Sequence, residues 1–167
     1  MKKFKIKSFC KINLSLRVSK SLNNGYHNIR SLVTFCNLHD VISISKIKGV
    51  YDKISFSGRF KKGVNEKSNT ITNVLYQLRK RNFFQKQAFK IAIQKNIPHG
   101  SGLGGGSSNA ADVLNFFNTK MRLKLNKAEI CKIAYKIGFD TPVSLEKKNT
   151  LITGKKGEIL RLNQKFR

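Results

Sequence analysis

The chain has 167 residues, of which 40% are hydrophobic and 10% aromatic, so it can bury one good core and is not a disordered protein. No stretch approaches the roughly 18 apolar residues of a transmembrane helix, and no apolar signal-peptide block follows the first residues. The net charge of +26 would be typical of a nucleic-acid-binding protein, but the 34 basic residues are scattered along every segment. We therefore favour biased codon choice in an AT-rich genome as the source of the charge over nucleic-acid binding. We therefore expect one cytoplasmic domain over residues 1–167 that makes no membrane contact, although its basic surface would help attract a polyanionic substrate.

Alternating apolar and polar residues predict strands in the first 60 residues. Residues 4–18 fit two strands that join near Cys10 and Lys11. Further strands are expected at 32–35, 41–45 and 51–60.

The rest of the chain mixes helices and strands. Ser68 is the expected cap of a helix over about residues 69–81, whose apolar residues recur at helical spacing. A second helix at 127–137 ends at Gly138, and Asp140 follows in a short loop before a proline. Strands are expected at 89–93, 150–153 and 158–162.

The three cysteines, Cys10, Cys36 and Cys131, are widely spaced and form neither a C-x-x-C motif nor a histidine-paired metal pattern. We expect reduced thiols that serve as small core residues, and no metal site built from protein side chains.

One glycine-rich stretch, residues 97–112, organises the chain. Five glycines are followed by Ser107 and Ser108 and then by an apolar run that is typical of a helix. Glycines adopt positive φ and leave the backbone open to a ligand, while the N-terminus of a helix presents free N–H groups and a partial positive charge. The stretch predicts a phosphate-binding loop.

Several phosphate loops can be told apart by their sequence. The Walker pattern is absent because no lysine precedes Ser107 or Ser108. The pattern G-x-G-x-x-G occurs, but the segment after it is expected to be helical, whereas a dinucleotide-binding fold needs a strand there. The spacing that remains, Pro98-x-x-x-Gly102-Leu103-Gly104-x-x-Ser107, resembles the phosphate loop of the GHMP kinases. A flexible glycine linker is the plain alternative, but linkers rarely lead directly into an apolar helix.

Further segments resemble one family within the GHMP kinases, the 4-diphosphocytidyl-2-C-methyl-D-erythritol kinases. Residues 10–16 are similar to the family's opening A-K-I-N-L-x-L, and residues 25–27 match its G-Y-H. Residues 69–71 resemble N-L-I, and residues 138–142 resemble G-A-D-V-P. These segments follow the family's order over almost the whole chain, so together they are more specific than any one motif.

The resemblance implies a mixed α/β (α+β) fold of the ribosomal-protein-S5-domain-2-like type. It also implies ATP-dependent phosphorylation, with Mg²⁺, of the 2-hydroxyl of the cytidylyl-methylerythritol substrate in non-mevalonate isoprenoid precursor biosynthesis. Another GHMP small-molecule kinase is one alternative. A catalytically inactive domain that binds nucleotide or nucleic acid through its charge is another, and steep salt dependence of RNA binding without ATP turnover would favour it.

By the same resemblance, Asp140 would be the general base, and Lys11 would lie beside it to keep it ionised and to lower the pKa of the substrate hydroxyl. Tyr26 would stack on the cytosine and His27 would hydrogen-bond its edge, with Asn13 also contacting substrate. By residue type alone, Lys11 would be a surface residue and Asp140 a loop residue. The residues implied at the ATP site are Asn69, Lys95, Pro98, Gly100, Ser101, Gly102, Leu103, Gly104, Gly105, Gly106, Ser107 and Ser108.

Two features depart from the family pattern. Residues 154–158 are close to the family's G-x-G-E but not identical to it. The chain stops at Arg167, where the family continues into a second α/β domain that provides one wall of the substrate cleft. We therefore expect the C-terminal GHMP domain to be absent, so that the chain is a partial clone, a truncated product, or a chain that another polypeptide completes.

Overall fold

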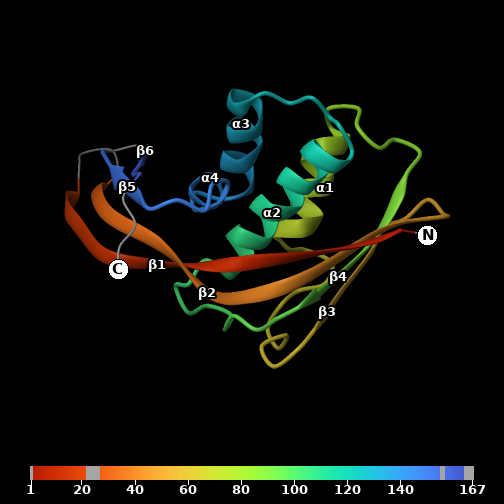
Figure 1. The fold of residues 1–167 in the computed structure, drawn as a ribbon, viewed down its shortest axis with the longest axis horizontal. Helices are drawn as coiled ribbons and strands as arrows, with labels where there is room; N and C mark the ends of the chain where they lie inside the picture. Colours follow the sequence, from red (N-terminus) through yellow and green to blue (C-terminus); the bar gives the residue numbers. More distant parts are fainter. Residues whose placement is uncertain (1, 22–26, 155–156, 164–167) are drawn as a thin grey trace.

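The computed structural model describes residues 2–21, 27–154 and 157–163. One mixed sheet carries helices on one face, and the long strands β1 and β2 run beneath them (Figure 1). The elements in chain order are β1 (Lys3–Ser21), β2 (His27–Ile47), β3 (Lys53–Ser57), α1 (Thr70–Arg79), β4 (Ala88–Gln94), α2 (Gly105–Lys120), α3 (Lys127–Ile137), α4 (Thr141–Ser144), β5 (Thr150–Thr153) and β6 (Glu158–Arg161). Among the described residues, no helix is long and apolar enough to cross a membrane.

β1 and β2 are each one continuous strand, so the prediction of two strands in each region was wrong. The antiparallel ladder between them shifts register between Phe9 and Lys11 and again between Asn13 and Ser15. A register shift of this kind interrupts the alternation of side chains without ending the strand. The sequence pattern therefore looks broken near Cys10, where the backbone only changes register.

The far edge of β2 is shared between two partners. β4 pairs with residues 41–47 of β2, and β5 pairs with residues 31–33, both antiparallel. β3 adds to β4 in parallel, and β6 adds to β5, which gives the order β3-β4-β2-β5-β6 with β1 on the near edge of β2. The segment that follows β4 approaches β2 at Asp40, between these two ladders, and this placement builds the site.

The helices cover the sheet with a single hydrophobic core. α1 and α2 pack against each other, and α2 also contacts β1 and α4. The core side chains come from both layers and include Ile42, Ile44, Leu78, Phe89, Ile91, Ile93, Leu114 and Phe117. The predicted helix at 127–137 is confirmed with the same bounds, and the helix at 69–81 and the strand at 89–93 are confirmed with small changes at their ends.

Local chemistry explains where the predicted boundaries were wrong. Asn69, rather than Ser68, caps α1, because its Oδ1 accepts the N–H groups of Ile71 and Thr72 at 2.9 and 3.0 Å. The strand expected at 51–60 is limited to β3. Asp140 lies at the N-cap position of α4, a one-turn helix in a segment that was predicted to be a loop.

Candidate active site

The glycine-rich stretch forms a loop that delivers the chain into α2. Gly100, Gly102 and Gly104 have φ of +73°, +75° and +65°, a region that residues with side chains rarely adopt. Gly104 is the N-cap of α2, and no side chain caps the helix there. The first turn of α2 therefore presents backbone N–H groups at the positive end of the helix dipole, which is the arrangement that binds phosphate.

Lys11 on β1 and Asp140 before α4 meet at this loop. Lys11 Nζ lies 3.3 Å from Asp140 Oδ2, although 129 positions separate the two residues in the sequence numbering. The lysine side chain is only 6% exposed, whereas that of Asp140 is 46% exposed. The carboxylate is thus open to a ligand on one side and held by a buried cation on the other.

The backbone of the loop fixes Lys11 in place. Its backbone N–H donates to Leu103 O at 3.0 Å, and its Nζ donates to Gly102 O at 3.4 Å. The lysine stem lies so close to Gly104 that a Cβ at that glycine would be 2.8 Å from Lys11 Cγ. The loop glycine is therefore required by the packing of the lysine as well as by its own positive φ.

Asn13 extends the polar network along β1. Lys11 Nζ donates to Asn13 Oδ1 at 2.8 Å, and Asn13 Nδ2 donates to Ser31 Oγ at 2.7 Å. Ser31 in turn donates to Ser15 O at 2.8 Å. Asn13 was predicted to contact substrate. In the structure its side chain holds the head group of Lys11.

A second, fully buried charge cluster supports the loop from beneath. The carboxylate of Asp40 is paired with Lys95 Nζ, and both side chains are at most 5% exposed. Asp40 Oδ1 also accepts the N–H groups of Asn96 and Ile97 at 2.7 and 2.9 Å. A buried charge is tolerated when it is paired and its remaining sites are hydrogen-bonded, as here.

Asp40 was not among the expected site residues. Asn109 in α2 completes its shell by donating from Nδ2 to Oδ2 at 3.0 Å. Lys95 was expected at the nucleotide. Its Nζ lies beside Gly105, since a Cβ there would be 3.4 Å away, but its charge is directed to Asp40.

Two expected nucleotide contacts have other partners in this structure. Asn69 is occupied by the cap of α1, and its Nδ2 donates to the backbone of Asn65 and Glu66. Ser108 is fully buried, and its hydroxyl lies 3.3 Å from that of Ser144 in α4. Its side chain is a packing contact between helices, which leaves Ser107 as the partly exposed hydroxyl of the first helical turn.

The remaining expected residues are placed as follows. Ser101 donates to Pro98 O at 2.9 Å and so closes the turn that begins the loop. Tyr26 lies outside the described residues. His27 begins β2, but its side chain is also outside the described part of the chain. The predicted contact of these two residues with a base stays a prediction.

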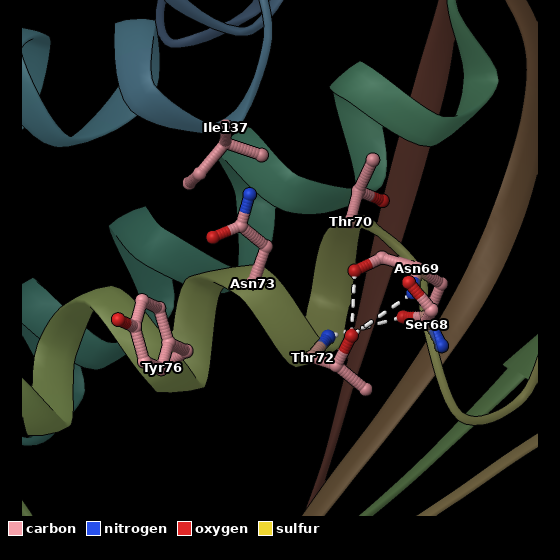
Figure 2. A pocket seen from close by; sticks show the side chains of 7 residues that line it. All are labelled: Ser68, Asn69, Thr70, Thr72, Asn73, Tyr76 and Ile137. Atoms are coloured by element: carbon pink, nitrogen blue, oxygen red, sulfur yellow. Dashed lines mark hydrogen bonds between the residues drawn. The ribbon is translucent and has the colours of Figure 1, made fainter.

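A pocket of about 430 Å³ adjoins the loop on the α1 side (Figure 2). Thr70 joins the two, because its Oγ1 donates to Gly106 O at 2.9 Å. The pocket has no charged side chain in its lining, which consists of Ser68, Asn69, Thr70, Thr72, Asn73, Tyr76 and Ile137. It does not provide charge for a phosphate, so the predicted phosphate site stays with the loop, the start of α2 and Lys11.

The whole chain is similar in sequence to known proteins. Residues 69–147, which include α1, the glycine loop and Asp140, match the GHMP kinases N terminal domain. The 4-diphosphocytidyl-2-C-methyl-D-erythritol kinase of Pelagibacter ubique is 40% identical over all 167 residues, which correspond to 58% of that protein. The chain therefore contains a GHMP kinase N-terminal domain. The enzyme of the same name from Finegoldia magna is 35% identical over 95% of this chain and 56% of its own length.

Solved structures agree with this chain in fold. A crystal structure of 4-(cytidine 5'-diphospho)-2C-methyl-D-erythritol kinase superposes with a TM-score of 0.75 at 24% identity, over 95% of this chain and 55% of the other. Homoserine kinase from Cytophaga hutchinsonii gives a TM-score of 0.72 at 15% identity, over 96% and 51%. The expected mixed α/β fold is confirmed. The chain spans little more than half the length of the relatives that it matches.

Proposed function

We propose that this chain is the ATP-binding, N-terminal domain of a kinase that phosphorylates the 2-hydroxyl of 4-diphosphocytidyl-2-C-methyl-D-erythritol, and that residues 1–167 fold as one domain in the cytoplasm. The observation that carries the proposal is the contact of Lys11 with Asp140 beside the uncapped start of α2. The relatives named for this reaction support the choice of substrate. The reaction belongs to non-mevalonate isoprenoid precursor biosynthesis.

The phosphates of ATP bind at the glycine loop. The N–H groups at the start of α2 have no side-chain cap and follow loop glycines with positive φ, and Lys11 adds a positive charge beside them. Binding there would offset part of the negative charge of the phosphates. Because phosphoryl transfer depends mostly on positioning and electrostatic stabilisation, such a prearranged surface supplies much of what the reaction needs.

Asp140 accepts the proton of the attacking hydroxyl. Its half-exposed carboxylate can hydrogen-bond a substrate alcohol, while Lys11 holds the other side of the group. The same lysine also donates to the loop carbonyl of Gly102, so it links the carboxylate to the glycine loop. Asn13 holds the lysine head group from β1 and so keeps this geometry.

Mg²⁺ fits this arrangement as a companion of ATP. No group of three or more metal-binding side chains occurs among the residues that the structure describes. Nucleotide-bound Mg²⁺ needs few protein ligands, because phosphates and water supply most of its oxygens. Ser107, the partly exposed hydroxyl in the first turn of α2, is the side chain that would face it, and the ion would offset the charge that develops on the transferred phosphoryl group.

The deciding experiment measures ADP release by the purified 167-residue chain with ATP and Mg²⁺. The acceptors are 4-diphosphocytidyl-2-C-methyl-D-erythritol, mevalonate, homoserine and galactose in separate reactions. Turnover with the cytidylyl substrate alone supports the proposal, and turnover with another alcohol overturns its choice of substrate. If ATP binds but no acceptor is phosphorylated, the experiment is repeated with the C-terminal part of the Pelagibacter ubique relative added as a separate polypeptide. Continued inactivity in that mixture would overturn the proposal.

A further inference from the structure

Cys10, one residue before Lys11 on β1, faces Cys36 on β2. Cys10 Sγ and Cys36 Sγ are 2.8 Å apart and are both free thiols. Cys10 is completely buried, whereas Cys36 is partly exposed. We propose that Cys10 and Cys36 are a redox-active pair, which closes reversibly into a disulfide by exchange with a low-molecular-weight disulfide.

The register of the two strands brings these cysteines together. Phe9 pairs with His39 and Lys11 pairs with Phe35, so only Cys10 on β1 lies opposite residues 36–38 on β2. Both cysteines lie within the register shift of the ladder, and their Sγ atoms are already in contact at 2.8 Å. The thiols need less than about 1 Å of further approach to reach the bond length of ~2.05 Å.

Exposure sets the order of the chemical steps. The thiolate of Cys36 attacks a sulfur of oxidised glutathione, which forms a bond between Cys36 and glutathione and releases one glutathione thiolate. Cys10 then loses its proton to solvent and attacks Cys36 Sγ, so that the protein disulfide forms and the second glutathione leaves as a thiolate. Two protein thiols are oxidised, and one glutathione disulfide is reduced to two glutathione molecules.

The second step is expected to be the slower one. Burial and the neighbouring Cys36 raise the pKa of Cys10 to about 12, so its thiolate is scarce at neutral pH. Proximity compensates for this scarcity, because the attacked sulfur is already in contact with Cys10. The mixed disulfide at Cys36 should therefore exist briefly and then resolve.

The cysteine pair lies directly beside the candidate active site. The family pattern has alanine where this chain has Cys10, so the thiol is not a requirement of the shared site. A covalent bond there would join β1 to β2 directly beside Lys11, whose backbone N–H donates to Leu103 O of the glycine loop. The third cysteine, Cys131, lies on α3 and provides an internal control.

The test uses the full chain without nucleotide, so its result does not depend on the proposed kinase activity. The protein is incubated with oxidised and reduced glutathione in graded ratios and then blocked with iodoacetamide. Intact mass and peptide mapping without reductant are measured. We expect a linked pair of peptides containing Cys10 and Cys36, and full recovery of free thiols with reductant. A chain that keeps glutathione on Cys36, or that links Cys131 instead, would overturn the proposal.

Variants separate the two steps. Cys10→Ala should hold glutathione on Cys36 as a stable mixed disulfide, whereas Cys131→Ser should close like the unmodified chain. The closed loop spans 26 positions, and a cross-link of that size should raise Tm by roughly 5–10 °C. A fall in Tm on oxidation would contradict the inference that closure fits the native strand register.

Discussion

Lys11 Nζ lies 3.3 Å from Asp140 Oδ2, and the exposures of the two side chains differ strongly. The lysine is enclosed by the glycine loop and by Asn13, while half of the aspartate faces solvent. This asymmetry separates the two proposed roles, because the buried cation is fixed and the open carboxylate is the group that a substrate can reach.

Asp140→Asn should abolish phosphoryl transfer, because the amide cannot accept the hydroxyl proton. We expect kcat to fall by at least about 100-fold, and the Kd for MgATP to change by no more than about threefold. Steady-state ADP release and calorimetric titration of MgATP measure the two quantities. Equal loss of binding and turnover would show that Asp140 serves the nucleotide instead.

Gly104→Ala should displace Lys11, because the added Cβ would lie 2.8 Å from Lys11 Cγ. Gly100→Ala is the matched control. It has a similar φ of +73°, but nothing lies within 4 Å of its added Cβ. Both variants carry the cost of a side chain at positive φ, about 1–2 kcal/mol, so the difference between them isolates the lysine contact. We expect MgATP affinity to fall several-fold further in Gly104→Ala, and equal affinities would argue that the position of Lys11 is not set by this glycine.

Asp40→Asn should destabilise the domain strongly. The change leaves the Lys95 ammonium buried without a counter-charge, and breaking such a pair by removing one partner typically costs about 3–5 kcal/mol. Asp52→Asn is the control, because Asp52 pairs with Arg79 at a more exposed position and should cost less. Urea unfolding of the three proteins gives the comparison. A loss at Asp40 no larger than at Asp52 would contradict the role of the buried cluster.

Lys147→Met should make stability depend on pH in a defined direction. Burial raises the pKa of Asp112, and Lys147, whose Nζ lies 3.1 Å from Asp112 Oδ2, opposes that rise. Without the lysine, the folded-state pKa of Asp112 lies still higher above its unfolded value of about 3.9. A raised pKa favours the protonated folded form, so the variant should approach wild-type stability near pH 4 and lose roughly 1–2 kcal/mol as the pH rises toward 7.

The matched control for that prediction is Lys148→Met, which removes a neighbouring lysine that is more than half exposed. Chemical unfolding at several pH values between 4 and 7.5 measures both variants. A pH profile of Lys147→Met parallel to that of Lys148→Met would show that the lysine does not control the ionisation of Asp112.

Local pattern was enough to predict much of this domain. The glycines, the serines and the apolar run after them predicted a loop that opens a helix, because positive φ and helical spacing are local properties. Family resemblance selected Lys11 and Asp140 as partners, although neither residue is distinguished by type or neighbourhood. The sequence by itself thus predicted most of the helices and strands, the glycine loop that opens α2 and the identity of the residues expected to meet there.

Only the tertiary structure decided the contacts that depend on distant residues. A register shift in β1 keeps one strand continuous through Cys10 and places that thiol against Cys36, and alternation alone cannot reveal it. Asp40 lies in the gap between the ladders of β4 and β5. There it accepts the backbone N–H groups of residues 96–97 and pairs with Lys95. Burial also directed Ser108 into the helix interface. Such pairings follow from which surfaces pack together in three dimensions, and no local spacing of residues encodes them.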